Sequence, residues 1–64
     1  EQVVVYTKSG VTVKLFASNS SDYSSYCDTK GKVTTIDTKA LPAGTYTIKL
    51  TDAKESVSLK IKVN

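Results

Sequence analysis

The sequence predicts an all-β fold, a small antiparallel β-sandwich of five to seven short strands. Three observations carry this prediction. Val, Ile and Thr together supply 20 of the 64 residues, and these residue types favour strands. Apolar and polar residues alternate in several segments, whereas no segment repeats apolar residues at the spacing of a long helix. Turn signals recur about every ten residues, as in sandwiches. A chain of this length allows one domain, covering residues 1–64.

The first half of the sequence predicts two strands and a loop. Residues 3–5 begin an apolar strand, residues 8–10 supply a turn, and the alternation resumes over residues 11–15. We expect these two runs to pair as a hairpin. Residues 17–22 are small and polar, which is typical of an exposed loop or crossover.

The second half predicts two further turns. An Asp side chain can bond the backbone two residues on, and Gly can take a positive φ, so Asp28 and Gly31 mark one turn. Residues 51–56 join two alternating strands as another hairpin. The residues expected to face the core there are Tyr46, Ile48, Leu50, Val57, Leu59, Ile61 and Val63.

The segment Leu41–Tyr46 refines the fold class. Pro42 presets a turn, and Gly44 supplies the positive φ that closes it. Tyr46 then enters the next strand with its ring inward, so that its hydroxyl can return to a backbone group just upstream. This is the tyrosine corner of immunoglobulin-like sandwiches, and we therefore expect an immunoglobulin-like sandwich.

Composition argues against several function classes. Nine Lys and no Arg against six Asp and Glu give a net charge of +3 without any basic run, which argues against nucleic-acid binding. The longest apolar stretch is too short for membrane insertion. The chain has no His, the residue most often used for general acid–base catalysis. We therefore expect that the protein is not an enzyme and binds no cofactor. A Ser activated by a Lys is the one catalytic arrangement that its composition still permits. No metal site is expected, although two of the turn Asp residues could meet around Ca²⁺.

Three side chains have two readings each. Cys27 is expected to be a half-buried strand residue, with an intermolecular disulfide or a reactive thiol as the alternative. Tyr23 and Tyr26 are flanked by serines, which indicates exposed rings able to contact a partner or a sugar; the alternative is that they lie half-inside for packing, as Tyr commonly does in strands.

Residues 26–64 also resemble a known family. The runs at 28–33, 36–50 and 60–63 are similar in order and spacing to the C-terminal sorting domains of the type IX secretion system of Bacteroidetes. Those domains combine Gly-Lys or Gly-Arg, then Leu-Pro-Ala-Gly-x-Tyr, then a terminal Lys-rich strand. The resemblance implies a non-catalytic secretion signal that is recognised at the outer membrane. It also implies a secreted or cell-surface protein whose partners are protein secretion machinery or neighbouring protein domains.

We expect the recognition surface to include the last strand, where Lys60, Lys62 and Asn64 face outward beside an open backbone edge. The same lysines also discourage edge-to-edge aggregation. Two other functions remain open: a structural or adhesive surface module, which predicts self-association or a missing strand, and a carbohydrate-binding module that uses Tyr23 and Tyr26.

Overall fold

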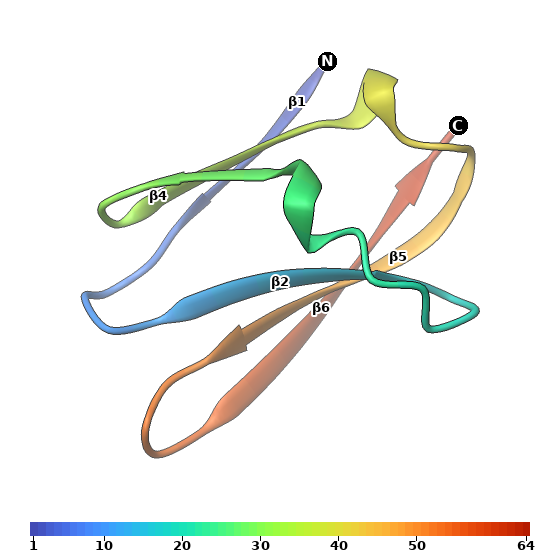
Figure 1. The fold of residues 1–64 in the computed structure, drawn as a ribbon. Coiled ribbons are helices and arrows are strands. Elements are labelled where there is room, and N and C mark those ends of the chain that lie inside the picture. Colours follow the sequence, from blue (N-terminus) through green and yellow to red (C-terminus); the bar gives the residue numbers. More distant parts are fainter.

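The computed structural model describes all 64 residues and confirms the all-β fold (Figure 1). Two short 3-10 helices accompany six strands: β1 (Gln2–Tyr6), β2 (Thr12–Ala17), η1 (Ser24–Tyr26), β3 (Cys27–Lys30), β4 (Val33–Asp37), η2 (Thr38–Ala40), β5 (Gly44–Thr51) and β6 (Ser56–Val63). The strands form two three-stranded sheets with antiparallel pairing throughout. Sheet A has the order β1-β4-β3, and sheet B has the order β2-β5-β6.

The core lies between the two sheets. Leu15, Tyr46 and Ile48 enter it from sheet B, and Ile36 enters it from β4 of sheet A. Leu41 and Val63 complete the buried apolar set. Thr34 is the one buried polar residue, and its hydroxyl is satisfied by the hydroxyl of Thr29 at 2.8 Å. A buried polar group with such a partner avoids the desolvation cost of an unpaired one.

The expected hairpin between residues 3–5 and 11–15 is wrong. Strand β1 pairs with β4, with Val3 opposite Ile36, whereas β2 pairs with β5, with Leu15 opposite Ile48. The connection at residues 7–11 therefore crosses from one sheet to the other (Figure 1). Alternation identifies the buried face of a strand but not its neighbour, so it could not separate a hairpin from a crossover.

The two later hairpins are present. β3 and β4 turn at Gly31, whose φ is +62°. Asp28, expected in that turn, instead lies within β3 opposite Thr35, and that expectation is wrong. β5 and β6 are joined by residues 52–55, where the Asp52 carboxylate accepts backbone N–H groups of Lys54 at 2.8 Å and Glu55 at 2.9 Å. The Asp side chain thus holds the loop closed.

The expected corner at Leu41–Tyr46 is confirmed. The Tyr46 hydroxyl donates a hydrogen bond of 2.6 Å to the Pro42 carbonyl oxygen, and the residue is only 2% exposed. Gly44 has a φ of +151°, a conformation that side-chain-bearing residues rarely adopt.

Burial along β6 differs from the expected pattern. Tyr46, Ile48 and Val63 are buried, and Leu50 and Ile61 are half-buried. Val57 and Leu59 lie on the inner face, opposite Leu50 and Ile48, yet each is 46% exposed. Ile48, which lies opposite Leu59 on β5, is only 1% exposed, so in this row the cover over the core reaches β5 but does not extend over β6. The prediction that Val57 and Leu59 are core residues is wrong.

Candidate functional site

The free edge of strand β6 is the candidate site. β6 is the outermost strand of sheet B and pairs only with β5. Lys60, Lys62 and Asn64 are all exposed, and the two lysines alternate with half-buried Ile61 and buried Val63. Every second residue of an edge strand directs its backbone N–H and C=O away from the sheet. The edge therefore combines unpaired backbone groups with outward positive charge.

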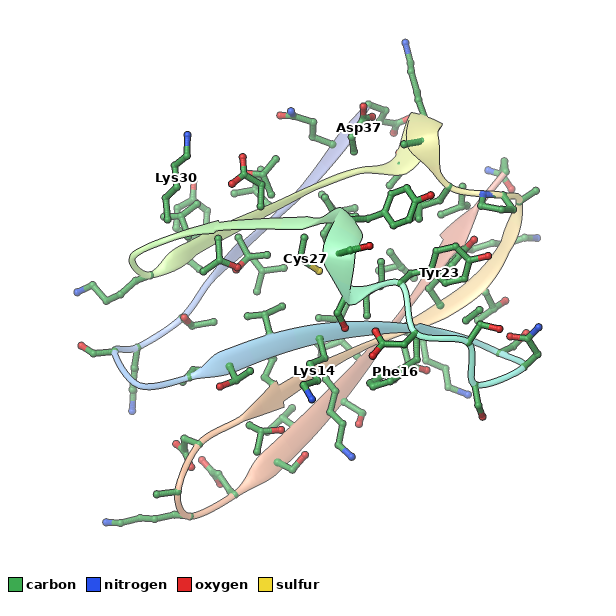
Figure 2. All side chains as sticks on the ribbon, in the orientation of Figure 1. Lys14, Phe16, Tyr23, Cys27, Lys30 and Asp37 are labelled. Carbon is green, nitrogen blue, oxygen red and sulfur yellow. The ribbon has the colours of Figure 1, made fainter.

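The positive charge extends across the outward face of sheet B. Lys14 on β2 lies directly opposite Lys49 on β5, while Lys60 and Lys62 on β6 lie opposite threonines. Figure 2 shows Lys14 on the side of β2 away from Cys27, together with Phe16. Like charges placed opposite each other on neighbouring strands destabilise a sheet. The strands of sheet B carry no Asp or Glu to offset them.

Part of the other edge of sheet B is closed by the chain itself. The backbone N–H of Ala17 donates to the Ser21 oxygen at 2.9 Å, and that of Tyr23 donates to the Leu15 oxygen at 2.8 Å. The Leu15 N–H donates to Ser24 Oγ at 3.0 Å. The segment from Ser21 to Ser24 thus covers the second half of the β2 edge, at Leu15 and Ala17, whereas nothing in the chain pairs with the outer edge of β6.

Asp22 lies in that segment and stabilises it. Its carboxylate accepts the Ser24 backbone N–H at 2.8 Å. Hydrogen bonds from the Ser24 side chain and backbone lower the pKa of Asp22, with a smaller effect from Lys14. The backbone of Asp22 also forms an isolated antiparallel β-bridge with Phe16. This pairing brings the Asp22 carboxylate to the rim of the outward face of sheet B.

Tyr23 is not exposed as expected. Its ring packs edge-to-face on Tyr46, with centroids 5.4 Å apart, and lies 5.5 Å from the ring of Tyr26. Tyr23 is half-buried against the core, whereas Tyr26 is 42% exposed. Burial, together with the two neighbouring tyrosines, raises the pKa of Tyr46. The serines around Tyr23 concealed its packing role, because a half-buried ring needs only one apolar neighbour in space.

Cys27 is the half-buried strand residue that the sequence predicts. It has a free thiol and packs against the core from β3. Burial raises the pKa of the Cys27 thiol, and the negative charge of Asp22 raises it further. A raised pKa lowers the thiolate fraction at neutral pH, and with it the nucleophilicity of the residue.

Three of the acidic residues stabilise local backbone geometry. Asp37 accepts the Lys39 backbone N–H at 3.1 Å, as Asp22 and Asp52 do in their own loops. No group of three or more His, Cys, Asp or Glu side chains lies close enough together to hold a metal ion. None of the helices has the length and apolar character needed to cross a membrane.

One apolar feature beside β6 was missed by sequence reasoning. A groove runs between the end of β1 and the β5–β6 loop, and its apolar lining is Tyr6, Val11, Leu50 and Val57. Tyr6 is 77% exposed. The uniform alternation of β6 contains no signal that sheet A stops short of Val57 and Leu59.

These features define a small two-sheet β-domain whose accessible polar groups and exposed apolar residues meet along one edge strand. A family model for the secretion system C-terminal sorting domain matches residues 2–64. The chain belongs to this family, the C-terminal sorting domains of type IX secretion. The match also takes in β1 and β2, which lie outside the segment that resembled the family by its motifs.

The family sets the general function. Its members are non-catalytic sorting signals, and a protein that carries one is exported to the cell surface or secreted. No curated protein and no solved structure matches the chain.

Proposed function

We propose that this domain directs a cargo protein through the outer membrane to the cell surface, and that secretion machinery recognises it along strand β6. Lys60, Lys62 and Asn64 form the outward part of the recognised surface. The observation that carries the proposal is the free edge of β6, which is uncovered while the second half of the β2 edge is covered by residues 21–24. An uncovered edge strand is a template for a second protein.

The fold proposed for this role is immunoglobulin-like. The sheet orders β1-β4-β3 and β2-β5-β6 correspond to strands B-E-D and C-F-G of a constant-type immunoglobulin domain. The hydrogen bond from Tyr46 to Pro42 lies between the strands equivalent to E and F, where such domains have their tyrosine corner. In sheet A the outer strands are β1 and β3.

Cargo export tests the sorting role. Residues 1–64 are fused behind an unrelated periplasmic protein in a host with a working type IX system. The fusion should reach the cell surface, as measured by protease accessibility on intact cells. An intact, folded fusion that stays in the periplasm would refute the proposal.

A pair of substitutions that removes charge tests the surface. Lys60→Ser with Lys62→Ser keeps the inward residues Ile61 and Val63 and should reduce export with little change in stability. The matched control is Lys30→Ser with Lys54→Ser, which removes the same charge from exposed positions in β3 and in the β5–β6 loop and should leave export unchanged. Deleting residues 60–64 is a poorer test, because it also removes buried Val63 and can unfold the domain.

A structural or adhesive module is the second candidate. The exposure of Val57 and Leu59 beside the free edge of β6 favours it, because subunits joined by strand addition bury such residues against the added strand. This function predicts self-association of the isolated domain, which analytical ultracentrifugation measures directly. A monomer whose fusion is exported would rule it out.

A further inference from the structure

The geometry points to a partner of defined chemistry: an extended strand in which apolar residues alternate with Asp or Glu, added to the free edge of β6. The inference deepens the proposed function, because it describes what the secretion machinery would present. Three observations carry it: the unpaired backbone, the exposed apolar residues on the inner face, and the lysines on the outer face.

The backbone sets the form of the partner. β6 has 8 residues, as long as its neighbour β5, and nothing in the chain pairs with its outer side. A partner that satisfies these groups must itself be extended, because only a strand matches their spacing. Side chains of an added strand then alternate between the two faces of sheet B.

The inner face sets the apolar half of the pattern. Val57 and Leu59 point toward the space between the sheets but are each 46% exposed, since sheet A ends short of them. Half-buried Ile61 continues this row. Side chains on the inner face of an added strand would lie beside this row, and apolar ones would remove its remaining surface from water.

The outer face sets the charged half. Alternate positions of an added strand would lie beside Ser58, Lys60 and Lys62. Opposite-charge pairs across neighbouring strands stabilise a sheet, and like-charge pairs destabilise it. The face itself selects an acidic strand over a basic one.

The same charges disfavour two of the ways in which a second copy of this chain could add to β6. In a symmetric antiparallel pair centred on Lys60, that residue faces its own counterpart, and a pair centred on Ile61 puts Lys60 opposite Lys62. A pair centred on Leu59 places Lys60 opposite Ser58 and avoids this repulsion, so the oligomeric state is measured in the test below.

A peptide pair tests the inference on the 64-residue chain. The first peptide alternates Val and Glu over the length of β6, with blocked ends, and the second alternates Val and Lys. Binding is followed by NMR, as shifts and slowed hydrogen exchange of individual backbone amides. We expect the Val/Glu peptide to bind with changes concentrated on β6. The Val/Lys peptide should bind about tenfold more weakly or worse.

Variants assign the two halves of the pattern. Lys60→Ser with Lys62→Ser should remove the preference for Val/Glu, whereas Lys30→Ser with Lys32→Ser should retain it. Leu59→Thr keeps a strand-forming residue and should weaken both peptides alike.

Each other outcome overturns the inference. Equal affinity for both peptides, no binding, or changes on β1 in place of β6 would each do so. Protection of β6 amides in a dimer without peptide would identify a second copy as the occupant. These results do not depend on export: an exported fusion with no peptide preference refutes the inference alone, and a β6-selective peptide with no export refutes the sorting role alone.

Discussion

Two leucines on the inner face of sheet B provide the sharpest test of the packing. Leu15 is 0% exposed and Leu59 is 46% exposed, although both point toward sheet A. We expect Leu15→Ala to lower the free energy of unfolding by about 2–5 kcal/mol, because it removes a fully buried side chain and leaves a cavity. Leu59→Ala should cost only about 1 kcal/mol, since roughly half of the side chain is already in water and no closed cavity forms.

Urea unfolding monitored by circular dichroism measures both costs. A domain of this size has roughly 3–10 kcal/mol of stability, so Leu15→Ala should move the unfolding midpoint to a much lower urea concentration, while Leu59→Ala should shift it only slightly. The two variants delete the same atoms from the same sheet, so each controls for the other. Equal costs would refute the conclusion that sheet A leaves Leu59 on β6 uncovered.

Three further predictions concern a turn, a loop and the thiol. Gly44→Val should lower the free energy of unfolding by about 1–3 kcal/mol. The cause is backbone strain alone, because a Cβ at this position meets no atom within 4 Å. A melting temperature unchanged from that of the parent would contradict this prediction. The backbone N–H groups of Lys54 and Glu55 hold the pKa of Asp52 below its usual range. The ionised carboxylate therefore stabilises the folded domain above about pH 4, and this contribution is lost as the pH falls through the lowered pKa of Asp52 in the folded state. In acid titrations Asp52→Asn should therefore lose stability less steeply than the parent. Cys27 should react with iodoacetamide at pH 8 more slowly than glutathione does in native buffer, and at the same rate as glutathione in 6 M urea. Equal rates in native buffer would show that the Cys27 thiol is not shielded.

Local signals in the sequence predicted the second half of the fold well. The Leu41–Tyr46 corner, the turn at Gly31 and the β5–β6 hairpin each depend on residues close together in the chain, and each is present. The β1–β2 hairpin failed because pairing is decided by tertiary packing, which alternation does not encode.

The site was predicted in part for the same reason. Alternation along β6 correctly directs Lys60 and Lys62 outward. It could not show that Val57 and Leu59 are exposed, because their exposure depends on where another sheet ends. Tyr23 was misjudged in the opposite direction, since its partner Tyr46 is distant in sequence.

The pairing of β1 with β4 and of β2 with β5 also governs how the chain folds. Val3 meets Ile36 and Leu15 meets Ile48, so these contacts close long loops, whereas only the β3–β4 and β5–β6 pairs join neighbours in the chain. Non-local strand pairing slows folding to about the millisecond-to-second range. On a growing chain, β1 and β2 lack partners until residues 33–51 have been made. The non-local pairs therefore form only when most of the domain is available, and their formation sets the rate of folding.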